Sequence, residues 1–211
     1  MVPTQHTLVA RLREHGSNAD WERFYLLYEA PILAFARAYS LDESECRDVL
    51  QETMVRMLRG GFERFDPAKG RFTGFLFNVA KGCVVDAIRR RNRHSSCEIS
   101  LENLSRELEN QLVRRSKLNG VTPAEAAERA GQIALIANTM ELLIRRRCFQ
   151  PRTVAIFRAV TFEAAAPHEV ARRYNTTVGN IYEAKRAVLS KLRQTLQVLE
   201  RGGDPEETTQ G

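Results

Sequence analysis

A helix-turn-helix pattern near the C-terminus constrains the fold more than any other feature of this chain. It runs from Pro167 to Leu196 with the sequence PHEVARRYNTTVGNIYEAKRAVLSKLRQTL. Ala171 supplies a small side chain where two helices cross, and Asn175, in the turn, tolerates a left-handed backbone better than most non-glycine residues. Thr177 is suited to cap the second helix, and Ile181 to pack it against the first. Because this motif places the second helix in a major groove, the pattern predicts a DNA-binding domain.

Composition and charge agree with a nucleic-acid partner. The net charge of +6 and the pI of about 9.4 favour an anionic partner. No apolar run approaches the length of a membrane span, and the N-terminus lacks the apolar core of a signal peptide, so a cytoplasmic protein is expected. The four cysteines are scattered without ligand spacing. We therefore expect neither a metal site, nor a disulfide framework, nor a cofactor.

The rest of the chain has helical periodicity and no strand-like alternation. A first helical domain is expected at residues 18–93. Its first helix carries apolar residues at helical spacing until Pro31 interrupts the pattern, which resumes at residues 32–39. The next helix begins near Asp42 or Glu43 and ends at the Gly60–Gly61 pair. Residues 62–71 are expected to form a loop, followed by a helix at residues 72–93.

The second half is predicted to be a separate helical domain. Residues 94–122 are polar and read as a linker, and Pro123 opens a domain at residues 123–200. Its helices are expected at residues 124–143 and 151–162, ahead of the helix-turn-helix. Residues 201–211 read as a disordered polar tail. The predicted fold is all-α, with two small helical domains joined by a flexible linker.

A polar face lies on the helix that precedes the glycine pair. Asp48, Gln51 and Glu52 share one side of this helix because they are three and four residues apart. Spacing alone favours a merely solvated face. The functional alternative is a docking patch for a basic partner helix.

Aromatic and cationic residues alternate in the loop and the start of the next helix. Phe62, Phe65, Phe72 and Phe75 are interleaved with Arg64, Lys69 and Arg71. Aromatic rings beside cations are typical of surfaces that stack unpaired bases and hold phosphates. For Phe72 and Phe75, burial in the core is an equally strong alternative.

The same helix ends in a cationic run. Val84, Val85 and Ile88 form its apolar stripe. Arginines near a helix C-terminus interact favourably with the helix dipole. This run contains more arginines than that interaction explains, so contact with phosphates is the favoured interpretation. The polar and cationic positions are Asn78, Lys81, Arg89, Arg90, Arg91 and Arg93.

The order of these segments resembles a bacterial RNA polymerase sigma factor of the compact, two-domain extracytoplasmic-function type. The resemblance rests on DVLQETMVRMLR, then FDPAKGRFTGFLFNVAKGCVVDAIRRRNR, then the helix-turn-helix, and it covers about residues 20–199. It implies a non-enzymatic protein that binds core RNA polymerase and promoter DNA. In this family an anti-sigma factor often sequesters the protein, although nothing in the sequence identifies one.

The resemblance also implies a role for each cluster. The face that matches Asp48, Gln51 and Glu52, with Arg56 beside it, would dock on a coiled coil of the largest polymerase subunits. Residues 65–81 would capture a flipped-out base of the −10 element and help to separate the strands, and Arg89, Arg90, Arg91 and Arg93 would hold phosphates. The −35 element would be read by the second helix of the helix-turn-helix, with the preceding helix braced on the backbone. The residues concerned are Arg172, Arg173, Thr177, Asn180, Tyr182, Glu183, Lys185 and Arg186.

Two departures from the family pattern limit what it implies. Phe75 stands where many relatives carry tryptophan, so the stacking surface is smaller. Tyr182 and Glu183 stand where lysine and serine are frequent, so the −35 sequence does not follow from the resemblance.

Two other functions fit the sequence less well. A transcriptional regulator with an N-terminal sensing domain would explain the helix-turn-helix, but not the basic loop and the arginine run. An enzyme is disfavoured because Asp66, Asp86 and Glu163 form no visible pair, and neither a phosphate-binding glycine loop nor a nucleophile elbow is present.

Overall fold

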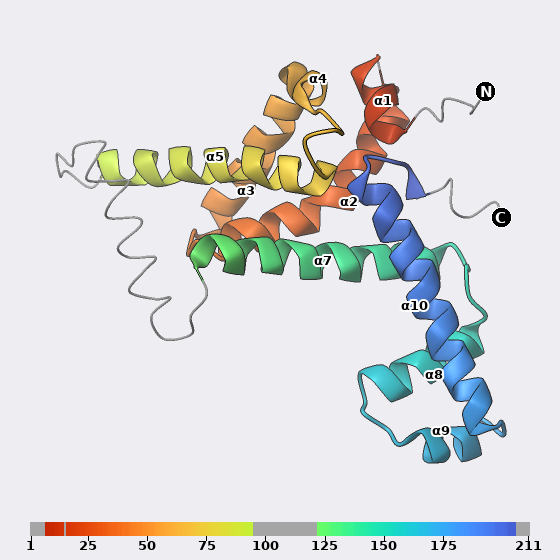
Figure 1. Cartoon of the computed structure of the whole chain (residues 1–211). Helices are drawn as coiled ribbons and strands as arrows, with labels where there is room; N and C mark the ends of the chain where they lie inside the picture. The colour runs from red at the N-terminus through yellow and green to blue at the C-terminus, as the bar shows by residue number, and fades with distance from the viewer. Residues whose placement is uncertain (1–6, 15, 95–121, 206–211) are drawn as a thin grey trace. The chain divides into compact units, whose positions relative to one another are not determined.

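A computed structural model of the chain describes residues 7–14, 16–94 and 122–205, and every regular element in these segments is helical (Figure 1). The expected all-α fold is therefore confirmed. The chain divides into two compact units, residues 1–135 and 136–211. The division falls inside α7 (Pro123–Arg145), whereas the sequence predicted a boundary ahead of Pro123. Most of the predicted linker, residues 95–121, lies outside the described residues.

The first unit begins with a helix that the sequence analysis missed. Helix α1 (Leu8–Arg13) is capped by Thr7, whose hydroxyl accepts a hydrogen bond from the Ala10 amide at 3.2 Å. Ser17 and Asp20 then form a reciprocal capping box at the start of α2 (Asn18–Arg37). The expected first domain, which started at residue 18, therefore leaves out an ordered helix.

Pro31 does not interrupt α2, contrary to the prediction. The helix continues through Pro31, and Tyr28, Ile32 and Phe35 are all buried. A proline inside a helix removes one backbone hydrogen bond and costs about 3 kcal/mol. Burial of apolar side chains on both sides of Pro31 against the same core offsets this cost.

Helix α3 (Glu43–Arg56) begins as expected, with Asp42 and Glu45 forming its capping box. It continues through a distorted segment, η1 (Met57–Gly61), in which Gly60 has a φ of 93°. The helix changes direction at Gly60, which belongs to the predicted glycine pair. Glycine can adopt this left-handed conformation without steric cost. A single turn, α4 (Phe62–Arg64), occupies the first part of the predicted loop, so the loop itself spans residues 65–71. Helix α5 (Phe72–His94) follows.

Helices α2, α3 and α5 pack on one another, and α1 packs on α2 and α4. Aromatic rings fill the space between them. Phe24 lies 5.1 Å from Phe62 and 6.1 Å from Phe72 between ring centroids, and Tyr28 lies 5.7 Å from Phe72. Phe72 has no exposed surface. This aromatic cluster joins α2, α4 and α5 into one core.

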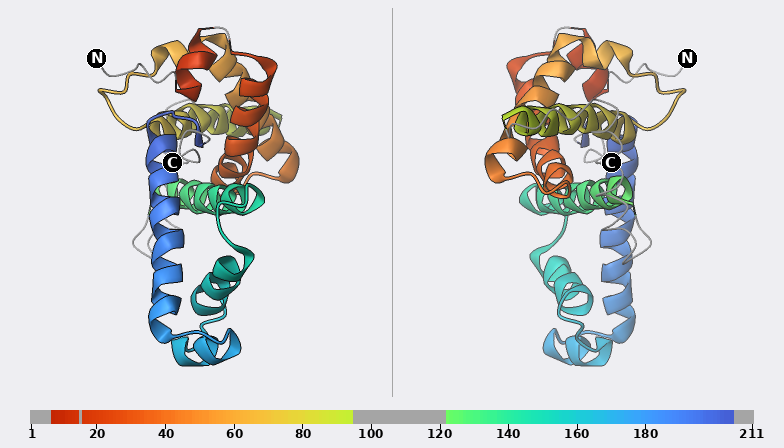
Figure 2. Two further views of the ribbon diagram at one scale, coloured as in Figure 1. Left: turned by 90° about the vertical axis from the view of Figure 1, so that its right-hand side faces the viewer. Right: turned by 90° about the vertical axis from the view of Figure 1, so that its left-hand side faces the viewer.

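The second unit contains α8 (Pro151–Thr161), α9 (Pro167–Arg173) and α10 (Val178–Glu200). Figure 2 shows α8 and α9 gathered at one end of the long α10. Their shared core is small and consists of Ile156, Ala159, Val170, Ala171 and Ile181. The helix predicted at residues 151–162 agrees with α8 to within one residue, and α10 continues to Glu200, beyond the end of the predicted motif at Leu196.

Helix α10 ends in an ordered turn. Gly202 has a φ of 75°, and the amides of Gly202 and Gly203 donate to the carbonyl oxygens of Leu199 and Val198 at 3.0 and 2.8 Å. This is a Schellman termination, which satisfies carbonyl groups at the end of a helix. The predicted disordered tail therefore does not begin at residue 201, and residues 206–211 lie outside the described part. Among the described helices, none combines the length and the hydrophobicity that crossing a bilayer requires.

Candidate nucleic-acid interface

The turn between α9 and α10 has the expected geometry. Asn175 adopts a φ of 43°, and the Thr176 amide donates to the Ala171 carbonyl oxygen at 2.9 Å. Ala171 is 6% exposed and Ile181 is fully buried, so both lie at the crossing of the two helices. The roles predicted for Ala171, Asn175 and Ile181 in the fold are confirmed.

Thr177 caps α10, as the sequence predicted. Its hydroxyl accepts a hydrogen bond from the Asn180 amide at 3.2 Å. The Asn180 side-chain amide in turn donates to the Thr176 hydroxyl at 3.0 Å. One amide hydrogen of the exposed Asn180 side chain is therefore bound within the motif.

The remaining residues predicted to read DNA lie along the first turns of α10. Tyr182 is 56% exposed, Glu183 and Arg186 are exposed, and Lys185 is half-buried. On α9, Arg172 is exposed, whereas Arg173 lies 3.8 Å from Glu163 and 5.7 Å from the centre of the Tyr174 ring. The geometry makes the N-terminal turns of α10 the accessible face of this motif, and Arg173 already has partners within the unit.

Arg152, on α8, was not predicted to have a role. Its guanidinium donates to the carbonyl oxygen of Tyr174 and, at 3.3 Å, to that of Asn175. These carbonyls belong to the turn that precedes α10, so Arg152 holds that turn from a neighbouring helix. No local pattern in the sequence could have shown this contact, because the partners are 22 and 23 residues away.

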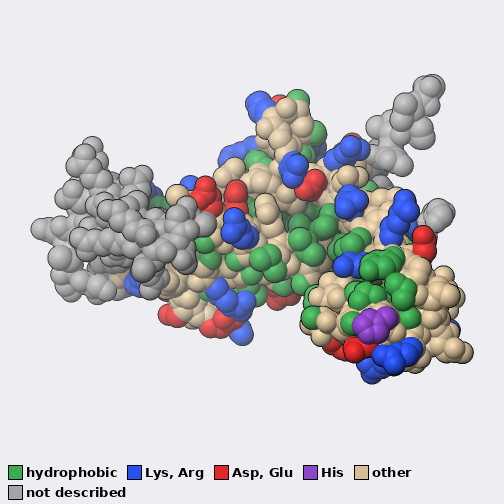
Figure 3. All heavy atoms as spheres, turned by 60° about the horizontal axis from the view of Figure 1, so that its bottom comes forward, with side chains coloured by type: hydrophobic (Ala, Val, Ile, Leu, Met, Phe, Trp, Pro, Cys, Tyr) green, Lys and Arg blue, Asp and Glu red, His purple; other side chains and the backbone are tan. Residues whose placement is uncertain are grey.

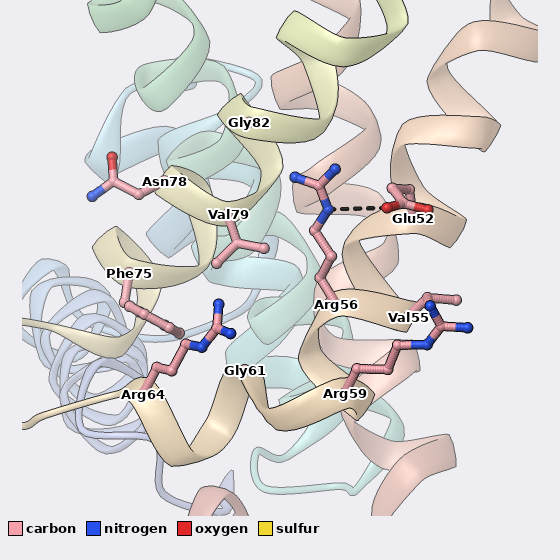
Figure 4. Close-up of a pocket in the computed structure, with 10 residues that line it drawn as sticks. All are labelled: Glu52, Val55, Arg56, Arg59, Gly61, Arg64, Phe75, Asn78, Val79 and Gly82. Atoms are coloured by element: carbon pink, nitrogen blue, oxygen red, sulfur yellow. Dashed lines mark hydrogen bonds and ion pairs between the residues drawn. The ribbon is translucent and has the colours of Figure 1, made fainter.

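In the first unit, a cavity of about 490 Å³ lies between the α3–η1–α4 segment and α5 (Figure 4). Three arginines and one aromatic ring line it, which combines positive charge with a surface for stacking. Its size is within the range of small-ligand pockets. The lining residues are Glu52, Val55, Arg56, Arg59, Gly61, Arg64, Phe75, Asn78, Val79 and Gly82.

Arg56 bridges the two sides of this cavity. Its Nε donates to Glu52 at 3.0 Å and its Nη2 to Asp86 on α5 at 2.7 Å. The hydrogen bond from Arg56 lowers the pKa of Asp86, and the same bond raises the pKa of Arg56. A Cβ at Gly82 would lie 3.2 Å from Nη1 of Arg56. Arg56, predicted to contact polymerase, is thus also a link between α3 and α5.

The predicted docking face lies on α3. Asp48 and Gln51 are exposed, while Glu52 is half-buried and bound to Arg56. Asp48 and Gln51 are therefore the members of this face most accessible to a partner.

Three of the four rings in the predicted aromatic and cationic cluster are in the core, Phe62 (3% exposed) among them. Phe65 is 5% exposed and Phe72 is fully buried, and their centroids are 5.2 Å apart. Phe65 and Phe72 both pack into the aromatic cluster. In this state neither ring offers a face to a base. The core alternative is therefore the one observed for Phe72, and it extends to Phe65. Phe75 is half-buried and lines the cavity, with its centroid 5.6 Å from that of Phe65.

The predicted cations lie on the surface, and several have acidic partners. In the loop, Lys69 and Arg71 are exposed, and Lys69 lies 3.7 Å from Asp66. Arg89 and Arg91 lie 3.3 Å from Asp86 and from Glu45. The remaining described residues of this set, Asn78, Lys81 and Arg90, are exposed, and the side chain of Arg93 lies outside the described residues.

Positive charge is not collected in one patch on the face that Figure 3 shows. Lys and Arg side chains occur there at several separate places, with Asp and Glu among them. Arg59, which the prediction left out, and Arg64, which belongs to the predicted aromatic and cationic cluster, bring additional cations to the cavity. Arg59 follows Arg56 by three residues, and this helical spacing was the signal that could have identified it.

The comparisons with known proteins concern the first unit. A family model described as sigma-70 region 2 matches residues 24–94. The matched segment contains the exposed face of α3, the cavity and the loop at residues 65–71, and it excludes α1 and the helix-turn-helix. Searches of curated proteins and of solved structures gave no match.

Proposed function

We propose that this chain is a two-domain promoter reader of the extracytoplasmic-function type. The premise is that residues 24–94 form a sigma-70 region 2 domain and that the chain is a sigma-70 family sigma factor. Sigma factors are not enzymes; they bind core RNA polymerase and promoter DNA to start transcription. The observation that carries the finer proposal is the helix-turn-helix with its capped recognition helix on the same chain as the region 2 domain.

Core polymerase is proposed to dock on α3 through Asp48 and Gln51. Both side chains are exposed, and a carboxylate suits a basic partner helix. Glu52 contributes less directly, since it is bound to Arg56.

The −10 element is proposed to bind at the cavity and its adjoining loop. The base of a flipped nucleotide would enter between Phe75 and the arginines and stack on the Phe75 ring, and the adjacent backbone phosphates would bind Lys69 and Arg71. Unstacking a base costs a few kcal/mol, which stacking and phosphate contacts offset. Strand opening thus uses binding energy rather than catalysis.

The −35 element is proposed to bind α10. The side chains of Tyr182, Glu183 and Arg186 are exposed and would contact base edges in a major groove, and the exposed Arg172 would contact the DNA backbone. Two weak DNA sites on one chain bind better together than either does alone. We therefore expect polymerase-bound protein to bind promoters far more tightly than free protein does.

The test is transcription with purified core polymerase. The full-length protein is added to core enzyme and genomic DNA, and discrete run-off transcripts are expected. Asp48→Arg should abolish core association, measured by co-migration on size exclusion. Glu22→Arg, the same reversal of charge at an exposed position of α2, serves as the control and should leave association intact. Tight sequence-specific binding of duplex DNA by the free protein, without core association, would favour an ordinary regulator instead.

A further inference from the structure

We infer that Arg13, on a helix outside the region 2 match, is a positioning residue for the loop at residues 65–71, and that α1 is thereby part of the −10 interface. The inference rests on the proposed role of this loop and of the cavity beside it. It adds a residue that neither the family match nor the sequence pattern assigns.

The contact joins the guanidinium of Arg13 to the backbone where the loop begins. Its Nε and Nη2 donate to the carbonyl oxygen of Phe62 at 3.2 and 2.9 Å, and Nη2 also donates to that of Phe65 at 2.8 Å. Phe62 begins α4, and Phe65 is its C-terminal cap. Hydrogen bonds from a charged donor are stronger than those between neutral groups.

Helix α1, which carries Arg13, is held in place by packing. Leu8, Val9 and Leu12 are 1%, 5% and 6% exposed, so the helix is held by its apolar face. The guanidinium of Arg13 therefore connects a packed helix to the first residue of the loop.

The loop is fastened differently at its two ends. At its far end, the Phe75 amide donates to the Arg71 carbonyl at 3.1 Å, and the adjacent Phe72 is fully buried. At the near end, the Phe65 amide reaches the Phe62 carbonyl at 3.3 Å, a long bond to an oxygen that Arg13 also binds. The Phe65 ring, 5% exposed, is also held in the aromatic core, and Arg13 adds charged donors to the backbone at this end.

This end of the loop borders the cavity. Arg64, which precedes the loop, and Phe75 both line the cavity, and the Phe65 ring contacts Phe75 with a centroid distance of 5.6 Å. A shift of the backbone at Phe65 would move the ring that supports Phe75. Arg13 therefore sets the position of the stacking ring without touching the base itself.

The first test measures the loop directly, by amide hydrogen exchange in the full-length protein. Arg13→Ala should speed exchange at residues 65–71 by about threefold to tenfold, the range for a lost charge-assisted bond at a partly exposed site, and leave α3 unchanged. Arg13→Lys should recover part of the protection. Arg11→Ala removes the ion pair to Asp20 without touching the loop, and should leave the loop at the wild-type rate. Equal loop exchange in Arg13→Ala and wild type would overturn the inference, whatever the protein's function.

The second test measures promoter opening. Holoenzyme is assembled on the strongest promoter found by run-off transcription, and strand opening is read by permanganate reactivity of thymines. Arg13→Ala should reduce opening about threefold to tenfold at unchanged core affinity, with partial rescue by Arg13→Lys. A loosened loop with full opening would overturn the inference. Failure of wild-type holoenzyme to open any promoter would instead overturn the proposed function, and the exchange experiment would still decide whether Arg13 holds the loop.

Discussion

The two units hold their proposed DNA-facing turns by different means. In the first unit, the loop at residues 65–71 is fastened by a buried aromatic cluster and by Arg13, a residue 49 and 52 positions away from its partners. In the second unit, the turn before α10 depends on a left-handed Asn175 and on Thr177, which caps an amide three residues on. One turn is maintained by long-range packing and the other mainly by local backbone chemistry.

The two units nevertheless share one kind of contact, an arginine bound to the backbone of the turn. Arg13 and Arg152 each extend from a neighbouring helix and donate to carbonyl oxygens of the turn. A guanidinium can bind two carbonyls at once because its donors are fixed in a planar fork. A turn formed by a local motif can therefore also be held by an arginine that is distant in the sequence.

The largest expected effect is on the aromatic core of the first unit. Phe72→Ala should lower the free energy of unfolding of this unit by about 3–5 kcal/mol, because a fully buried ring is lost. Urea denaturation followed by near-ultraviolet circular dichroism measures it. Phe162→Ala in the second unit is the matched control, since Phe162 is 73% exposed, and its effect should stay within about 0.5 kcal/mol. Similar losses in both variants would contradict the assignment of the core.

The next effect concerns the turn of the second unit. Asn175→Val should destabilise this unit by about 1–2 kcal/mol, because a β-branched residue is strained at a φ of 43°. The Asn175→Gly variant should unfold at the same temperature as the wild-type protein or at a higher one. Thermal unfolding of the two variants measures the difference, and equal melting temperatures would show that the turn is not held by its backbone conformation.

A smaller effect is expected at the cap of α10. Thr177→Ala removes the acceptor for the Asn180 amide and should cost about 1 kcal/mol. Thr177→Ser retains the hydroxyl and is the control. Chemical denaturation of both proteins tests whether the hydroxyl, rather than the threonine methyl, stabilises the helix start.

The smallest effect is at the ion pair between α3 and α5. The hydrogen bond from Arg56 holds the pKa of Asp86 below its ordinary value, so the pair stabilises the fold above the unfolded pKa and loses this contribution as pH falls through the folded pKa. Both partners are partly exposed, so Asp86→Asn should cost less than about 1 kcal/mol at pH 7. The difference from wild type should shrink below about pH 4. Urea midpoints at neutral and acid pH test this, and a difference that does not depend on pH would contradict it.

Sequence reasoning succeeded where neighbouring residues determine the structure. The starts of α3 and α10 follow from Asp42 and Thr177, and the turn of the helix-turn-helix follows from Asn175. It failed at Pro31, where local propensity predicts an interruption, because burial on both sides keeps α2 continuous. The missed α1 is short, and its order comes from packing on α2 and α4.

The candidate site was only partly predictable for a related reason. The sequence identified the right segment, but the interleaved phenylalanines did not reveal that Phe65 and Phe72 would be buried while Phe75 lines the cavity. All three rings are consistent with one apolar pattern. Which of them faces the cavity depends on how α4 and α5 meet.

By itself the sequence determined the all-α fold, the positions of the main helices and the capped start of α10. These features depend on periodicity and on groups within a few residues of one another. Only the tertiary structure decided that Arg56 bridges to Asp86, 30 residues away, and that Arg13 holds the start of the loop. Arginines are numerous in this chain, and their long side chains reach many partners. The partner of each is set by the packing of helices that are distant in the sequence, and no local pattern encodes it.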